Sequence, residues 1–506
     1  MSLISKRKSL EQITKEANSH GLRRCLGPWR LTTIGVGATV GAGIFVMTGT
    51  AAANFAGPAV VLSFIIAAIA CLFTALSYGE LSSTIPVAGS AYSYAYTSLG
   101  EKFAWAVGWL LLLEYGISAV SVASGFSSYS ASLLQDFHIN LPSFIHHPMF
   151  QPSPEGYGKG IMVTKSIDLV GAISVIIASI ALLFGVSEST TINGIIVTLK
   201  VGILILFIAI GIFYINPVNL TPFIPESTGT MNFGTTGIFR AASTIFFAYI
   251  GFEAVSTAAS EARKPQTDIP FGIIASLVIS TLIYIGVAFV LVGVVPYKQL
   301  NVSDPLAIAT NYINIPFLTW TLKISAVIGL CSVMLVLLYG QSRIFFIMAK
   351  DGLLPPAFCK LHSRYKTPWL GTLILGICVS VATAFLPIDI ISDLVSLGTA
   401  TAFSIVCLTV IWQRNAHPDL PRPFKVPFGG FKIKGVWIGY IPLLGIMCCL
   451  TMIVPLLIDM VASIFHHNPI PMILLVSYAL VGFFGYYSYG RKHSVLGKQI
   501  QSSDET

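Results

Sequence analysis

Charged side chains are scarce in this sequence of 506 residues. Asp, Glu, Lys and Arg together make up 10% of it, whereas a soluble domain usually carries about 25%. Hydrophobic residues account for 55%, and the mean hydropathy is +0.80. The shortage of charge excludes an ordinary soluble enzyme and predicts a polytopic membrane protein that lies mostly within the bilayer.

Two other signals are missing. Residues 1–30 are polar and basic, so they lack the short apolar core and the cleavage site of a signal peptide, and the first apolar segment is expected to be retained. The eight cysteines show no paired spacing, and six of them lie in apolar runs, where cysteine packs as a small hydrophobe. Neither a metal site nor a disulfide framework is predicted.

Apolar runs of about 20 residues predict twelve membrane spans. The spans lie near residues 31–52, 58–83, 103–134, 167–186, 192–215, 235–258, 271–296, 318–349, 369–387, 394–413, 436–459 and 470–489. Of the 29 Lys and Arg residues, 23 fall on the side of the N-terminus and four on the other side. The positive-inside rule therefore predicts that both termini are cytoplasmic. The net charge of +8 reflects this bias and requires no nucleic-acid partner.

Glycines that weaken a helix concentrate in the first and sixth spans. The first contains GATVGAGIFV (37–46), and the sixth contains FFAYIGFE (246–253) with Gly251 in its middle. Each such glycine costs roughly 1 kcal/mol relative to alanine. Interrupted helices at equivalent positions of two five-span halves indicate a transporter site, because free helix ends offer N–H groups to an anion and carbonyls to a cation. Close helix packing through small residues is the alternative interpretation.

Two ionisable residues lie deep in predicted spans. Glu114 is roughly 16 Å into the third span, and Lys200 is roughly 12 Å into the fifth. Because charges in a bilayer are costly, both are functional candidates. Lys200 would act as a proton carrier or a fixed cation, and Glu114 as a binding or coupling carboxylate. A snorkelling lysine and a structural Lys200–Glu114 ion pair are the alternatives.

Three further charged residues have weaker signals. Glu253 follows the interruption in the sixth span, so it is a candidate for a cytoplasmic pathway or a carboxylate at a helix interface. Glu80 and Arg240 lie nearer to span ends, where anchoring or pairing is expected.

Eight stretches, running in order over nearly the whole chain, carry a family resemblance. They are GVGATVGAGIFVMTG (35–49), AGPAVVLSF (56–64), YGELSSTIPVAGSAYSYAY (78–96), GEKFAWAVGWLLLLEYGISAV (100–120), FFAYIGFEAVSTAASEARKPQTDIPFGI (246–273), GQSRIFFIMAKDGLLPP (340–356), KTPWLGT (366–372) and HPDLPRPFKVPF (417–428). The chain resembles a bacterial amino acid permease of the amino acid–polyamine–organocation (APC) superfamily, in its cationic amino acid transporter branch.

The resemblance implies an all-α polytopic membrane protein of the LeuT type, with twelve helices, a 5+5 inverted repeat and breaks in helices 1 and 6. The implied parts are a cytoplasmic N-terminal tail (1–30), a first repeat (31–215), a second repeat (235–413), helices 11 and 12 (436–489) and a cytoplasmic C-terminal tail (490–506).

The resemblance also implies a binding site at the two breaks. The substrate carboxylate would lie on the N–H groups of Ala42 and Gly43. The substrate amino group would lie on backbone carbonyls, which belong to Val40, Phe247, Ala248 and Ile250. Phe247 also matches the aromatic residue that closes over the substrate.

Three further site residues follow from the same resemblance. Lys200 matches the lysine of proton-coupled members, which takes the space of a sodium ion in sodium-coupled ones. Glu114 matches the acidic residue of this branch's third span, and Cys331 falls near the substrate side chain by its spacing from Arg343. The chain departs from many relatives by reading Ala42 where they carry a hydroxyl residue, so backbone groups alone would hold the carboxylate.

The expected function is proton-coupled transport of L-amino acids across the cytoplasmic membrane by alternating access. The substrates would be cationic (arginine, lysine, ornithine) or small and neutral. No bond is made or broken, so no enzyme activity, metal or cofactor beyond coupling protons is expected. The expected partners are the amino acid and the lipid bilayer, with a monomeric protein and room for a small single-span subunit. A sodium-coupled carrier of the same fold and a membrane amino-acid sensor are the alternatives.

Overall fold

The computed structural model describes residues 26–85, 90–152, 161–185, 190–229, 231–465 and 468–498. Most of the expected N-terminal tail, residues 1–25, and the last part of the expected C-terminal tail, residues 499–506, lie outside the described residues.

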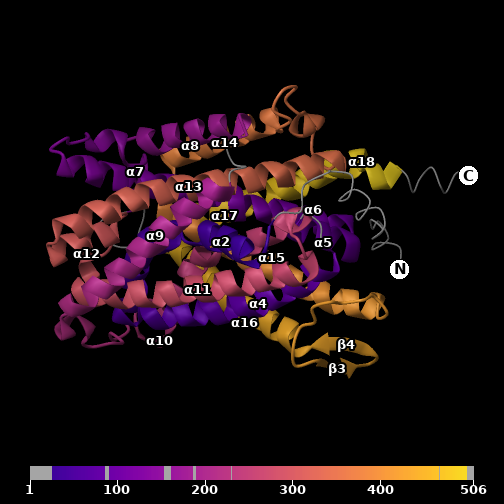
Figure 1. Cartoon of the computed structure of the whole chain (residues 1–506), viewed down its shortest axis with the longest axis horizontal. Helices are drawn as coiled ribbons and strands as arrows, with labels where there is room; N and C mark the ends of the chain where they lie inside the picture. Colours follow the sequence, from indigo (N-terminus) through magenta and orange to yellow (C-terminus); the bar gives the residue numbers. More distant parts are fainter. Residues whose placement is uncertain are drawn as a thin grey trace, which may run out of the picture.

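The described chain is a bundle of helices with two short hairpins (Figure 1). The helices are α2 (Pro28–Thr39), α3 (Thr48–Ala51), α4 (Val60–Thr84), α5 (Ser90–Ser98), α6 (Glu101–Leu111), α7 (Ser118–Asp136), α8 (Leu169–Leu183), α9 (Thr190–Gly211), α10 (Gly234–Ile245), α11 (Pro265–Val294), α12 (Pro305–Ile313), α13 (Pro316–Lys350), α14 (Trp369–Phe385), α15 (Ile388–Ala416), α16 (Tyr440–Phe465), α17 (Ile470–Gly485) and α18 (Arg491–His493). The strands are β1 (Phe150–Pro152), β2 (Ile161–Val163), β3 (Gly430–Ile433) and β4 (Val436–Gly439).

Within the described ranges, nine helical segments are long and apolar enough to cross a bilayer. One of them, residues 43–84, contains the expected second span and part of the first, and the shorter apolar helices α8 and α14 lie where the fourth and ninth spans are expected. The prediction of a polytopic helical membrane protein is confirmed, and the count of twelve spans stays a prediction.

Proline determines where several helices begin. α11, α12 and α13 start at Pro265, Pro305 and Pro316. The first turn of a helix has N–H groups without an intrahelical partner, so a residue that lacks an N–H fits there without loss. α12 ends before Asn314, which adopts the left-handed conformation with φ +57°.

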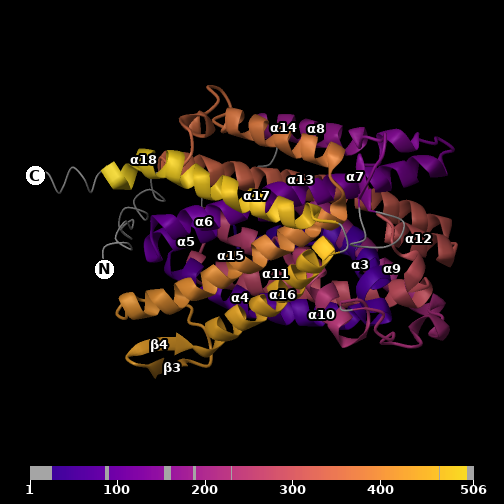
Figure 2. The same cartoon turned by 180° about the vertical axis from the view of Figure 1, so that it is seen from behind.

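The helices differ strongly in how deeply they are buried. The segment 234–259 includes α10, and 94% of its most apolar 18-residue stretch is buried inside the protein. For the segment 470–493, which includes α17, the buried share is 11%. α2 packs against α9, α11 and α13. α17 and α16 cover the face that is turned away from the viewer in Figure 1 (Figure 2). The segment 234–259 is therefore interior, and α17 offers its apolar surface to lipid.

The two hairpins were not predicted from the sequence. β3 pairs antiparallel with β4, and Ile433 lies opposite Val436 across a two-residue turn. Both turn residues, Lys434 and Gly435, have positive φ angles of 49° and 84°, as a tight hairpin turn requires. β1 and β2 also pair antiparallel, and Pro152 lies opposite Ile161.

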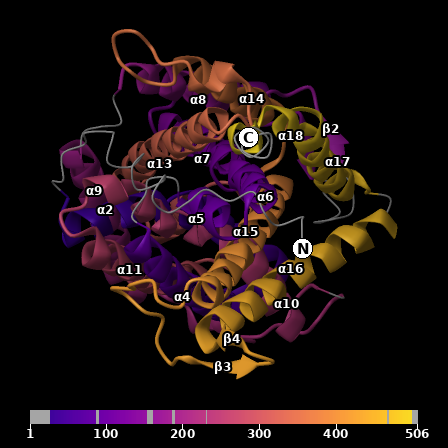
Figure 3. The ribbon, with the colours of Figure 1, turned by 90° about the vertical axis from the view of Figure 1, so that its right-hand side faces the viewer.

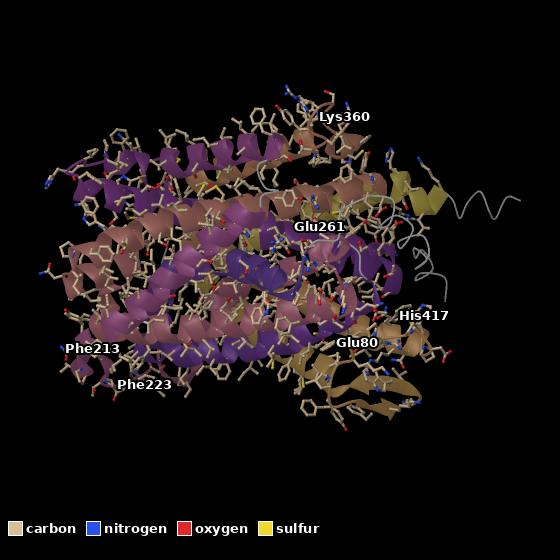
Figure 4. The ribbon with its side chains drawn as sticks, in the orientation of Figure 1. Glu80, Phe213, Phe223, Glu261, Lys360 and His417 are labelled. Atoms are coloured by element: carbon tan, nitrogen blue, oxygen red, sulfur yellow. The ribbon has the colours of Figure 1, made fainter. Side chains whose placement is uncertain are left out.

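The two ends of the bundle carry different connections. Figure 4 shows Glu80, Glu261, Lys360 and His417 toward one end of the long axis, and Phe213 and Phe223 at the other. α18 and the β3–β4 hairpin share the first end (Figures 1 and 2). Figure 3 looks along the long axis from that end and shows α8 and α14 together at one edge. The chain connections near Glu80, Glu261, Lys360 and His417, which the count of Lys and Arg residues assigns to one side of the membrane, thus lie toward the same end of the bundle.

Candidate substrate site

Helical conformation stops at Thr39 in the first apolar segment and resumes at Gly43. Val40 caps the end of α2 with an extended ψ of 90°, and a π-helical segment spans Gly43–Met47. The first N–H groups of a helix and the last carbonyls of another have no partner within their own helix. The Val40 N–H still donates to Val36 and the Gly41 carbonyl accepts from Phe45, so residues 40–42 form a short break in the helix inside the protein.

The segment that follows α10 changes direction in a similar way. A 3-10 turn spans Phe246–Tyr249, Ile250 is extended with ψ 133°, and a second 3-10 segment begins at Phe252. Gly251 lies between them with φ +120°, a conformation that glycine adopts at little cost. The glycine in the middle of FFAYIGFE is thus required by backbone conformation.

The breaks at residues 40–42 and 250–251 are called the first and second gap below. They face each other across a close backbone contact. A side chain on Gly43 would collide with the Cα and Cβ of Ala248, and a Cβ on Gly251 would lie 2.6 Å from the carbonyl carbon of Ala38. Real Cβ atoms do not approach other atoms so closely. Close backbone packing therefore already requires glycine at both positions, and the binding role of the two breaks stays a prediction.

Lys200 of α9 is fully buried at the first gap. Its Nζ donates to the carbonyl oxygens of Gly37, at 2.5 Å, and Val40, at 2.8 Å. These carbonyls belong to the C-terminal end of α2, where the helix dipole favours a positive charge. Snorkelling is excluded because none of the residue is exposed. The ion-pair alternative also fails within the described residues, since Glu114 is not a partner of this ammonium.

Tyr284 of α11 touches both gaps. Its hydroxyl lies 2.7 Å from the carbonyl oxygen of Thr39 and 2.9 Å from that of Ala248. The hydroxyl carries a single proton, so the two carbonyls share one donor. Sequence reasoning missed this residue, and the available signal was a hydroxyl group within the apolar run LIYIGVAFVL.

Glu114 and Glu253 form a second buried polar group. Glu253 is fully buried and accepts from the N–H of Gly251, at 2.9 Å, and from the hydroxyl of Tyr115, at 3.0 Å. Glu114 is also fully buried, its carboxyl neighbours that of Glu253, and neither of its oxygens has a donor among the described residues. The structure brings the two acidic candidates together and separates both from the ammonium of Lys200.

The other expected site residues differ in position. Ala42, Ala248 and Ile250 are buried at the two gaps, as are Val40 and Phe247. Cys331 of α13 is only partly buried. Instead Val333 of the same helix faces the first gap, since a Cβ on Gly41 would lie 3.0 Å from its Cγ1. The structure therefore places the residues expected to offer backbone groups at the two gaps. It also packs Val333 of α13 against the first gap.

Charged residues near the span ends pair as the sequence predicts. Arg240 of α10 is fully buried, and it pairs with Asp393 of α15, at 2.6 Å, and with Asp459 of α16, at 2.8 Å. Glu80 of α4 pairs with Arg414 of α15. Within the part of the chain that the structure describes, no three His, Cys, Asp or Glu side chains are grouped as metal ligands.

Comparisons with known proteins identify the family of the chain. A family model described as "Amino acid permease" matches residues 26–484. The methylthioribose transporter of Bacillus subtilis is 38% identical over 498 residues, which cover 98% of this chain and all of that protein. The branched-chain amino acid permease BcaP of the same organism is 38% identical over 98% of this chain and 99% of its own. The vacuolar cationic amino acid transporter 2 of Arabidopsis thaliana is 36% identical over 82% of this chain and 64% of its own.

Proposed function

The chain belongs to the amino acid permease family, and on that premise we propose that it carries L-amino acids across the cytoplasmic membrane by alternating access, driven by protons. The substrates are cationic amino acids or small neutral ones. The proposal includes the LeuT-type arrangement of twelve helices, with spans 1–5 and 6–10 as inverted repeats and both termini in the cytoplasm.

The contact between Lys200 and the end of α2 is the observation that supports proton coupling. An ammonium group bound to the carbonyls of Gly37 and Val40 fills the position that a coupling cation would take at a helix C-terminus. Loss of its proton would remove the charge that holds these carbonyls, so protonation and the conformation of residues 37–40 are linked. A lysine can perform this exchange because its ammonium can release a proton, which a guanidinium does not do in proteins.

The free helix ends suit a zwitterionic substrate. Its carboxylate would accept from the N–H groups at Ala42 and Gly43, which begin the second half of the first segment. Its ammonium would donate to carbonyls at Val40, Phe247, Ala248 and Ile250. Phe247, Ile250 and Val333 are apolar neighbours of the gaps, so pocket shape would select the side chain. Glu114 would couple protons or meet a cationic side chain, and Glu253 would line the cytoplasmic pathway.

The names of the relatives point to different classes of substrate. Two of them are named for branched-chain and cationic amino acids, and a third for methylthioribose. A competition panel in proteoliposomes addresses this, with all twenty amino acids and methylthioribose tested against labelled L-arginine and labelled L-alanine. Absence of uptake of both labels, together with exchange of labelled methylthioribose, would overturn the proposed amino-acid specificity.

The same proteoliposomes separate the coupling ions and the two alternative functions. An inward proton gradient should drive accumulation, and replacement of sodium by choline should leave the rate unchanged. Dependence on sodium would favour the sodium-coupled carrier. Absence of counterflow for every compound in the panel would favour a sensor, because a protein that only binds its ligand does not exchange it.

A further inference from the structure

The hydroxyl group of Ser396 lies inside the helical hydrogen-bond ladder of another helix. Ser396 belongs to α15 and is buried, with 1% of its surface exposed. Its Oγ accepts from the N–H of Phe247, at 3.2 Å, and donates to the carbonyl oxygen of Thr244, at 3.1 Å. Residues 244 and 247 are three apart, so these two backbone groups would pair directly in a 3-10 turn. The hydroxyl of Ser396 therefore bridges these two backbone groups.

The position of this insertion coincides with a change in helix type. α10 ends at Ile245, and the 3-10 turn Phe246–Tyr249 follows. A side chain that enters a backbone ladder is one of the established causes of a kink. The conformation of Gly251 turns the chain further along. The bonds to Ser396 act earlier, at the start of the turn that carries the carbonyls of Phe247 and Ala248.

A network one turn away along α15 holds the serine in place. The hydroxyl of Thr244 donates to Asp393, at 3.2 Å, and Asp393 pairs with the guanidinium of Arg240. Asp393 precedes Ser396 by three residues, so both side chains lie on one face of α15. α10 is therefore bonded to α15 at two successive turns, and the ion pair sets the height at which the serine meets the ladder.

We propose that Ser396 is a positioning residue for substrate binding: its hydroxyl keeps the ladder open at Phe247, so that α15 sets the direction of the carbonyls that hold the substrate amino group. The inference rests on the proposed function of the two gaps. It adds a residue that does not touch substrate and assigns to α15 a role in the affinity of the site.

The test compares three variants in proteoliposomes, with KM and Vmax of counterflow measured for labelled L-alanine and L-arginine. Ser396→Ala is expected to raise KM about tenfold with Vmax within about twofold, because misdirected carbonyls weaken binding. Ser396→Thr keeps the hydroxyl and should restore the wild-type KM. The control is Ser404→Ala on the same helix, because the Ser404 hydroxyl donates to the carbonyl of Ala400 in its own helix. A wild-type KM for Ser396→Ala, or an equal rise for Ser404→Ala, would overturn the inference.

A second measurement is independent of transport. In an experimental structure of Ser396→Ala, the N–H of Phe247 and the carbonyl of Thr244 should approach to direct hydrogen-bonding distance, about 3 Å. An unchanged gap between them would show that the serine follows the kink and does not cause it. Failure of the wild type to exchange either amino acid would count against the proposed function, whereas this distance would still decide the role of Ser396.

Discussion

The Nζ of Lys200 lies 2.5 Å from the carbonyl oxygen of Gly37, a residue 163 positions earlier in the chain. The contact joins the fifth apolar segment to the end of the first, at the depth where α2 stops. Three carbonyls of that helix end accept from side chains of other helices: those of Gly37 and Val40 from α9, and that of Thr39 from α11.

Lys200→Ala removes the only donor that α9 provides to these carbonyls among the described residues. We expect proton-driven accumulation to be lost while counterflow and some binding remain, because the helix ends that meet the substrate stay in place. Uptake driven by an inward proton gradient and counterflow are measured in the same vesicles. Concentrative uptake at the wild-type rate would contradict the proton role of Lys200.

Tyr284→Phe deletes the hydroxyl that two gap carbonyls share and keeps the aromatic ring. Leaving buried carbonyls without a donor costs about 1–3 kcal/mol, so we expect KM to rise about fivefold to tenfold. Tyr249→Phe is the matched control, since the two rings lie 5.3 Å apart and the hydroxyl of Tyr249 donates to Phe64, away from the gaps. Equal effects of both variants would reduce Tyr284 to a packing role.

Gly43→Ala places a methyl group against Ala248. We expect substrate binding, measured by ligand-induced thermal stabilisation, to weaken at least about tenfold, because the gaps must separate to admit the methyl. The double variant with Ala248→Gly removes the opposing methyl but keeps the backbone Cα of residue 248, which the new methyl would still meet at 2.3 Å, so most of the loss in affinity should remain. Unchanged affinity in Gly43→Ala would return the glycine to packing alone.

Glu114→Gln replaces a buried carboxyl by a neutral group of the same shape. Because a second charge beside Glu253 would be costly at full burial, we expect the melting temperature of the variant to stay within about 2 °C of the wild type. Glu253→Gln should lower it clearly, since Gly251 and Tyr115 both donate to that carboxyl. The opposite order of the two variants would mean that Glu114 carries the charge.

Asp304 precedes α12, in the connection between α11 and α13. Burial raises the pKa of its carboxyl to about 6, against the opposing influence of the Ser132 hydroxyl and the Lys323 ammonium. The folded protein therefore holds this proton more tightly than the unfolded chain, and the contribution to stability is full below pH 4 and declines as the pH rises to about 6.

Asp304→Asn stays neutral throughout that range. Relative to the wild type, its stability should increase by up to about 3 kcal/mol between pH 4 and pH 7. Thermal unfolding in detergent at several pH values gives the difference directly. A constant difference between the two proteins across the range would show that Asp304 titrates alike in both states.

Much of the architecture follows from local sequence properties. Apolar runs place the helical segments because a bilayer-spanning chain must satisfy its backbone groups internally. The same argument picks out Lys200 and Glu114, because charge is rare in such runs. The short hairpins escaped prediction, since β3 and β4 are four residues each and depend on the positive φ of Lys434 and Gly435.

The sequence by itself determined that this chain is a membrane protein with weak helix centres in two segments and buried ionisable groups, because those properties depend on residue type and spacing. Only the tertiary structure decided the partners: Lys200 with the carbonyls of α2, Glu114 beside Glu253, and Ser396 within the ladder of α10. These contacts join residues more than a hundred positions apart. Their geometry depends on helix packing, which no local pattern encodes.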